Sequence, residues 1–217
     1  MKTHYLRKRN SINVLIQIID PHELETMEDE ICEIERRAET DDFDFIAVET
    51  DSWNTDLSPW EAPAVLGSEG FGAGARKTLE YIRENVVLPI NTGGNKNIIV
   101  GGYSLAGLFA LWAVCETDCF RGAAAVSPSV WFPGFTDYFR NKKVETEKIY
   151  LSLGKREENT RNQVMAKVGS SIREVYQALN EKKIKSVLEW NEGNHFTEPE
   201  IRTARGFSWL IGQKAGP

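Results

Sequence analysis

Short apolar runs rich in β-branched residues alternate along this chain with segments whose apolar residues recur at helical spacing. Six of these runs are typical of strands, and they cover residues 12–19, 43–49, 97–102, 123–126, 148–153 and 186–190. Helical patterns fill most of the intervals between them, for example over residues 105–114 and 162–180. This alternation predicts an α/β fold with a mostly parallel sheet of about six strands, right-handed connections and helices on both faces.

The length and charge of the chain bound its organisation. Its 217 residues predict one domain, with residues 1–11 as a basic leader to the first strand. Hydrophobic residues make up 41% and charged residues 27%, which excludes a disordered chain or a coiled coil. The net charge of −6 argues against nucleic acid or an anionic membrane as the main partner. No apolar run is long enough to predict a membrane span or a signal peptide.

Cysteine and histidine usage indicates neither disulfides nor a metal site. The three cysteines, Cys32, Cys115 and Cys119, are odd in number and complete no zinc-binding pattern. We expect them to be free thiols in the reducing environment of a cytoplasmic protein, and a redox pair of Cys115 and Cys119 is the alternative. The three histidines are scattered along the sequence, so we expect no bound metal and no cofactor.

Residues 101–107, GGYSLAG, join the third strand to a strongly apolar helix. A serine on a sharp turn between a strand and a helix is typical of a nucleophile elbow, which needs small residues at Gly102 and Ala106 because larger side chains would clash. Ser104 would then lie at the helix N-terminus, where the Leu105 N–H can donate to an oxyanion. The alternative is a serine that only caps the helix.

A base and an acid follow later strands in the order that an elbow serine requires. His195 comes directly after the sixth strand, in residues 191–196, NEGNHF. Glu157 and Glu158 follow the fifth strand, and either carboxylate could orient the histidine. The spacing favours Glu157, the third residue after Gly154. The alternative is that both glutamates are ordinary solvated charges.

Aromatic residues gather at the same strand ends. They are Tyr103, Trp53, Trp60, Trp131 and Phe132. We expect Trp53, Trp131 and Tyr103 to line a substrate pocket, and closing the top of the core is the alternative role. The second oxyanion donor normally follows an early strand. The candidates are the N–H of His22 and the N–H of Trp53, and the sequence does not decide between them.

Four segments, GGYSLAGLFALW, AAVSPSVWF, LSLGKREE and GNHF, occur in this order along the chain. As an ordered set they resemble the esterase-D-like branch of the α/β-hydrolase family, which includes siderophore esterases and feruloyl esterases. The resemblance covers roughly residues 12–210. It implies Ser104 as the nucleophile, His195 as the base and the acid at Glu157 or Glu158.

The same resemblance implies oxyanion donation from the N–H groups of Leu105 and His22. The chain also departs from the family pattern. Ala106 replaces the second glycine of the elbow, the acid is a glutamate, and only a short leader stands where relatives begin with an antiparallel hairpin. We therefore expect an α/β-hydrolase fold with a reduced N-terminus, no large cap and an open, shallow site.

Together these features predict a serine hydrolase that cleaves carboxylic esters through an acyl-enzyme intermediate. A small-molecule ester is the expected partner, and the sequence leaves a homodimer open. An acyltransferase or a thioesterase would use the same residues. A binding module that keeps the fold without the catalysis is the alternative from another class, and it requires Ser104 and His195 to lie apart.

Overall fold

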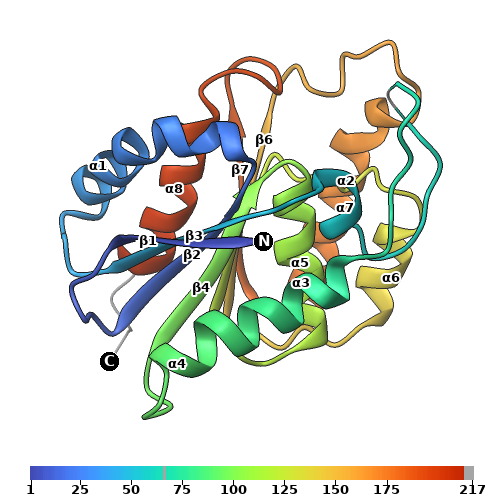
Figure 1. Ribbon diagram of the computed structural model, residues 1–217. Coiled ribbons are helices and arrows are strands. Elements are labelled where there is room, and N and C mark those ends of the chain that lie inside the picture. Colours follow the sequence, from blue (N-terminus) through green and yellow to red (C-terminus); the bar gives the residue numbers. More distant parts are fainter. Residues whose placement is uncertain (66, 213–217) are drawn as a thin grey trace.

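One sheet of seven strands forms the centre of the computed structural model, which describes residues 1–65 and 67–212. The strands are β1 (Lys2–Arg7), β2 (Asn13–Ile19), β3 (Asp44–Glu49), β4 (Asn97–Tyr103), β5 (Gly122–Val126), β6 (Lys148–Gly154) and β7 (Lys185–Asn191). Their spatial order is β1-β3-β2-β4-β5-β6-β7 (Figure 1). Strands β2 to β7 run parallel to their neighbours, and β1 runs antiparallel to β3. The mostly parallel sheet confirms the prediction made from the alternating pattern.

Residues 2–7 correct one expectation, because they form the edge strand β1 instead of part of a leader. This strand pairs with β3, and its residue Lys2 lies opposite Glu49. The Glu49 carboxylate is hydrogen-bonded to Lys2 Nζ at 2.7 Å and to His4 Nε2 at 2.8 Å. Lys2 and His4 at the start of the chain therefore help to hold β1 against β3. The sheet of the described residues has seven strands, where the apolar runs predicted about six.

Helices cover both faces of the sheet (Figure 1). On one face, α1 (Met27–Ala38) packs against α8 (Pro199–Gly212) and against the sheet. The other face carries α3 (Ala75–Ile82), α5 (Leu105–Glu116), α6 (Phe135–Asn141) and α7 (Val168–Glu181). Shorter elements connect these layers: η1 (Pro21–Thr26), α2 (Trp53–Asp56), the π-helical turn η2 (Arg83–Val87), α4 (Leu88–Ile90) and η3 (Met165–Lys167).

Burial on both faces explains why the central strands are continuous apolar runs. Strand β2 sends Val14, Ile16 and Ile18 into the core under α3 and α5, and it sends Leu15 and Ile19 into the core under α1 and α8. Helix α5 is buried almost all round, and its sequence is correspondingly apolar without an amphipathic stripe. The same burial makes these elements readable from sequence.

The carboxyl ends of β4, β5, β6 and β7 lie next to one another at one end of the sheet. The loops that follow them carry Ser104, Ser127, Glu157 and His195 respectively. Parallel strands of open α/β sheets commonly place ligand-binding residues at this end. Four separate stretches of sequence therefore converge on one site.

Candidate active site

The elbow forms a tight turn between β4 and α5. Ser104 has φ 58° and ψ −118°, a backbone conformation that costs energy for a residue with a side chain. Close packing excludes larger residues around it, because a Cβ at Gly102 would lie 2.5 Å from the Ala106 Cβ and 3.1 Å from the Ile18 carbonyl oxygen. The Ser104 N–H donates to the Val126 carbonyl at 3.0 Å. The turn therefore holds Ser104 at the N-terminus of α5, against β5.

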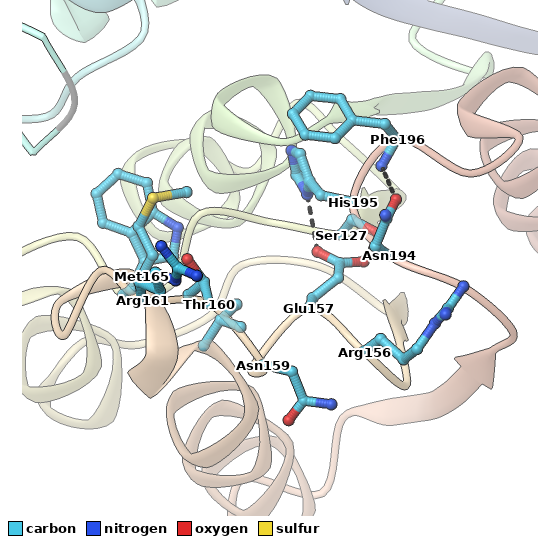
Figure 2. Close-up of a pocket in the computed structure, with 12 residues that line it drawn as sticks. Ser127, Arg156, Glu157, Asn159, Thr160, Arg161, Met165, Asn194, His195 and Phe196 are labelled. Atoms are coloured by element: carbon cyan, nitrogen blue, oxygen red, sulfur yellow. Dashed lines mark hydrogen bonds and ion pairs between the residues drawn. The ribbon is translucent and has the colours of Figure 1, made fainter.

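Hydrogen bonds join the predicted serine, histidine and glutamate into a chain. His195 Nε2 lies 3.0 Å from Ser104 Oγ. His195 Nδ1 lies 2.7 Å from Glu157 Oε2, the contact that Figure 2 marks with a dashed line. A proton on Nδ1, donated to the carboxylate, leaves Nε2 to accept the proton of the serine hydroxyl. The alternative acid Glu158 is directed elsewhere, with its Oε2 lying 3.4 Å from Arg173 Nη1 on α7. The structure thus brings Glu157, and not Glu158, to the histidine.

Glu157 is held by more groups than the histidine alone. Its side chain is only 3% exposed. Its Oε1 accepts hydrogen bonds from Ser127 Oγ at 2.7 Å, from the Gly154 N–H at 2.6 Å and from Arg202 Nη1 at 3.2 Å. Burial by itself would raise the pKa of the carboxyl, but the hydrogen bonds from His195, Ser127 and Gly154 hold this pKa below its ordinary value. The carboxylate therefore stays ionised at neutral pH.

Tyr103 supports the histidine loop, which differs from the pocket role expected for it. The side chain is buried, and its hydroxyl donates to the His195 carbonyl at 2.7 Å. Arg202 Nη1 in turn donates to the tyrosine hydroxyl at 3.2 Å. Burial raises the pKa of Tyr103 to about 12, so the hydroxyl remains a donor at neutral pH. Tyr103 is not among the described residues that line the two cavities at the site.

Two cavities flank His195. The smaller one, of about 250 Å³, contains Ser104 and Leu105 together with Trp53 and Phe71, and we call it the Ser104 cavity. The larger one, of about 450 Å³, is lined by polar residues that include Arg161, and we call it the Arg161 cavity. Trp131, Met165, His195 and Phe196 line both. The cavities are therefore two compartments of one cleft.

Figure 2 shows how the walls of the Arg161 cavity are arranged. Arg161 and Met165 lie on one side, and His195 with Phe196 lies on the other. The Arg156 side chain points away from His195. Phe196 is 86% exposed and its ring packs edge-on against the His195 ring at 5.4 Å, a role that the sequence reasoning missed although the residue follows His195 directly.

The aromatic residues predicted at the strand ends divide into two groups. Trp53 and Trp131 line the cleft, as expected for pocket residues. Trp60 instead donates its indole N–H to the Pro133 carbonyl at 2.9 Å, and its ring packs against Phe132 at 5.7 Å. Phe132 is buried in the core. This second pair closes the top of the core.

The structure does not bring His22 to the Ser104 hydroxyl. Its N–H donates to Asp20 Oδ1 at 3.0 Å, and the Glu23 carboxylate accepts from the Asp20 N–H at 2.7 Å. These two bonds form a capping box at the start of η1. His22 is exposed and is not among the described residues that line the cleft, whereas Trp53, the other candidate for the second oxyanion donor, lines the Ser104 cavity.

The described residues contain neither a metal-binding cluster nor a membrane-spanning helix. Across residues 1–65 and 67–212, no three side chains of histidine, cysteine, aspartate or glutamate lie close enough to hold a metal ion. Within the same part of the chain, every helix is too short or too polar to cross a bilayer.

Comparison with known proteins identifies the fold. No protein-family model matches the sequence, and no curated protein matches it. Among solved structures, the siderophore hydrolase EstA from Aspergillus nidulans matches with a TM-score of 0.70 at 20% identity, over 94% of this chain and 84% of that chain. An IroE-like serine hydrolase from Shewanella oneidensis matches with a TM-score of 0.72 at 13% identity, over 97% of this chain and 79% of that chain.

A third solved structure extends the comparison to a general esterase. The Bacillus cereus carboxylesterase matches with a TM-score of 0.64 at 14% identity, over 97% of this chain and 93% of that chain. The first two proteins are named as hydrolases and the third as a carboxylesterase, and the siderophore hydrolase is of a kind that the sequence resemblance named. Coverage of nearly the whole chain, with helices on both faces of a mostly parallel sheet, shows that this protein has the α/β-hydrolase fold.

Proposed function

We propose that the protein is a single-domain serine hydrolase that cleaves carboxylic esters of small molecules. The observation that carries this proposal is the hydrogen-bonded chain from Ser104 Oγ through His195 to the buried Glu157 carboxylate. A serine hydroxyl is a weak nucleophile unless an oriented base removes its proton, and this arrangement supplies both the base and its orienting acid. The hydrolase names of the structural neighbours support the same reaction class.

The reaction would proceed in two halves. His195 Nε2 takes the proton of Ser104 as Oγ attacks the ester carbonyl, and the ionised Glu157 stabilises the imidazolium that forms. The tetrahedral intermediate collapses when the imidazolium gives its proton to the departing alcohol, which leaves an acyl group on Oγ. Water then loses a proton to His195, attacks the acyl carbonyl and releases the acid, and Ser104 regains its proton.

Two backbone N–H groups would stabilise the oxyanion. Leu105 is the first residue of α5 and lines the Ser104 cavity, so its N–H has no partner within the helix. Trp53 is the first residue of α2 and lines the same cavity. We assign the second donor to the Trp53 N–H, because the His22 N–H is already bonded to Asp20.

The two compartments of the cleft suggest where the halves of the ester bind. The Ser104 cavity contains the nucleophile and Leu105, so it would hold the acyl part among Trp53, Phe71 and Trp131. The departing alcohol must receive its proton from His195. This histidine also lines the Arg161 cavity, so that cavity would hold the alcohol part of the ester. Polar groups in that cavity fit an alcohol that carries hydrogen-bonding substituents.

Labelling with a fluorophosphonate tests the proposal directly. At neutral pH the probe should modify one serine stoichiometrically, and mass spectrometry should map it to Ser104. Ser104→Ala and His195→Ala should both abolish labelling, because one removes the nucleophile and the other its base. Ser129→Ala is the matched control, since Ser129 Oγ lies only 3.4 Å from Ser104 Oγ without contact to His195 among the hydrogen bonds of the described residues. This variant should still be labelled.

Turnover of p-nitrophenyl acetate and butyrate then distinguishes the reaction types. Release of free acid identifies a hydrolase, whereas transfer of most acyl groups to added glycerol would favour an acyltransferase. A folded protein that resists the fluorophosphonate, or one that is labelled equally well after His195→Ala, would contradict the mechanism. That outcome would favour a binding module with the same fold.

A further inference from the structure

Arg202 is a buried cation behind the active site that the mechanism above does not use. It lies on α8, and its side chain is 2% exposed. Burying a guanidinium in a protein interior is costly unless carboxylate and hydrogen-bonding partners compensate for its lost hydration. The partners of Arg202 therefore indicate why the fold keeps a charge at this place.

All of these partners belong to the site or to the loop that carries His195. Arg202 Nη1 donates to Glu157 Oε1 at 3.2 Å and to the Tyr103 hydroxyl at 3.2 Å. The same nitrogen lies 3.5 Å from Ser127 Oγ, and Nη2 donates to the Glu192 carbonyl at 2.6 Å. One planar guanidinium thus connects the last residue of β4 with the loops after β5, β6 and β7, a geometry that a lysine ammonium does not reproduce.

The first consequence is electrostatic. Arg202 contacts Oε1 of Glu157, whereas His195 contacts Oε2. A fixed positive charge on the far oxygen favours the carboxylate over the carboxylic acid. It also offsets part of the negative charge that stabilises the protonated form of His195. Without Arg202, the protonated form of His195 would persist to higher pH. The neutral imidazole, which acts as the base, would then be present over a narrower pH range.

The second consequence is geometric. The histidine loop is held at two points, because Arg202 Nη2 binds the Glu192 carbonyl and Tyr103 binds the His195 carbonyl at 2.7 Å. Arg202 also binds Tyr103 itself. These contacts fix the backbone on both sides of Gly193, a residue with φ 91° that would otherwise let the loop move. The ring of His195 is therefore held between Ser104 and Glu157.

We propose that Arg202 is a positioning residue that compensates the negative charge of the Glu157 carboxylate, fixes the His195 loop and thereby sets the pH range over which Ser104 is activated. This inference rests on the proposed function for its kinetic readout. Other charged groups surround the same centre: Lys155 and Arg156 after β6, Glu192 after β7, Glu200 and Arg205 on α8, and Glu23 and Glu30 from η1 and α1. Arg202 differs from them by direct contact with Glu157.

The experiment compares Arg202→Gln with Arg205→Gln. Arg205 lies on the same helix but binds Glu189 Oε1 at 3.1 Å and Asn191 Oδ1 at 2.6 Å, away from the triad. In R202Q the acid limb of the kcat/KM profile should move to higher pH by about one unit, because the uncompensated carboxylate favours the imidazolium. In R205Q the limb should stay within about 0.2 units of the wild type, since no triad contact changes.

A second readout does not depend on turnover. The chain has only three histidines, so the ring resonances of His195 can be assigned with a His195→Gln variant and titrated by NMR. The midpoint of the His195 titration should rise in R202Q and stay unchanged in R205Q. If the protein proved not to be an esterase, this titration would still report the link between Arg202 and His195, so the two proposals fail separately.

Two further variants guard against misfolding of R202Q. Arg202→Lys should keep the midpoint, because it keeps the charge, while kcat falls at least fivefold because one ammonium cannot reach both Glu157 and Glu192. Tyr103→Phe should lower kcat without moving the midpoint, since it removes the hydrogen bonds to the His195 carbonyl and from Arg202 while the charge of Arg202 stays beside Glu157. The proposal is overturned if R202Q folds with an unmoved midpoint, or if R202K and Y103F both match the wild type.

Discussion

Two adjacent carboxylates, Glu157 and Glu158, lie in opposite environments. Glu157 is buried and contacts His195. Glu158 is partly exposed and forms an ion pair with Arg173 on α7. We therefore expect Glu157→Gln to lower kcat by about 10³- to 10⁴-fold, because the amide cannot hold the productive tautomer or stabilise the imidazolium. Glu158→Gln is the matched control and should change kcat by less than about twofold, as is usual for a surface ion pair.

Steady-state kinetics on p-nitrophenyl acetate at several pH values checks this expectation. Both variants should be folded by circular dichroism before rates are compared. Equal losses in E157Q and E158Q would mean that the loop after β6 as a whole, and not the Glu157 carboxylate, orients His195. A loss confined to E158Q would transfer the acid role to the neighbouring residue.

The residues of the hydrogen-bonded chain were predictable because they follow strand ends in a fixed order. Ser104 and His195 needed only the strand pattern and the small residues beside them. Arg202 was not predictable, since its role depends on how α8 packs against β4 and β6. The expectation for His22 failed for a reason visible in the sequence: Asp20 and Glu23 form a capping box that already uses the first N–H groups of η1.

Glu23, one of the two residues of the capping box of η1, has an unusually high pKa. Burial raises the pKa of Glu23 to about 7 from its ordinary 4.5, against the lowering effect of the hydrogen bond from the Asp20 N–H. The folded state therefore binds more protons than the unfolded chain between these values. The stability that Glu23 contributes is fully present below pH 4.5 and is lost as the pH rises through 7.

Glu23→Gln should remove this dependence while keeping the cap. A glutamine at the same position can still accept from the Asp20 N–H, and it imitates the protonated carboxyl. We expect the free energy of unfolding of E23Q to exceed that of the wild type by roughly 1–2 kcal/mol at pH 8 and to match it near pH 4.5. Urea denaturation at the two pH values measures the difference.

Glu25→Gln is the control on the same turn, where the side chain is exposed. It should leave the pH dependence of the wild type intact. A wild type whose stability does not fall between pH 5 and pH 8 relative to E23Q would contradict the raised pKa of Glu23. The pKa of the buried Glu30 is raised by burial and also by the charge of Glu23, so Glu23→Gln removes part of the pH dependence of Glu30 as well and adds to the measured difference.

Elements buried on both faces were readable from sequence, and the element exposed on one edge was not. The six predicted strands correspond to β2 through β7. Strands β2 to β6 are apolar runs in a double-sided core, and the edge strand β7 is partly buried but still carries the apolar residues Val187, Leu188 and Trp190. Strand β1 was not predicted because it has only six residues, most of them polar and all of them exposed or partly buried. Its stability comes from partners distant in sequence. Glu49 and Tyr81, which bond to Lys2, His4 and Thr3, identify it only once the chain is folded.

At the scale of the whole molecule, the sheet divides into a catalytic part and a supporting part. The loops after β4 to β7 carry the hydrogen-bonded chain, and β1 lies at the opposite edge of the sheet, with β3 and β2 between it and β4. Loss of β1 should therefore lower the stability of the fold without disturbing Ser104, His195 and Glu157, and Trp53, which follows β3, is the site residue on this side of the sheet. This separation makes deletion of β1 a clean test of the edge strand.

Deletion of residues 2–7 should lower Tm by about 5–10 °C, because β3 loses its edge partner and the poorly exposed Glu49 carboxylate loses Lys2 and His4. Adding Glu49→Gln to the deletion should recover part of the loss, since the uncompensated charge is then removed. Fluorophosphonate labelling of Ser104 at 25 °C should keep its wild-type rate in both proteins. A basic leader would behave differently: its removal would leave Tm unchanged, and Glu49→Gln would then bring no recovery. Scanning calorimetry of the three proteins, read beside the labelling rates, therefore decides whether the start of the chain is part of the fold.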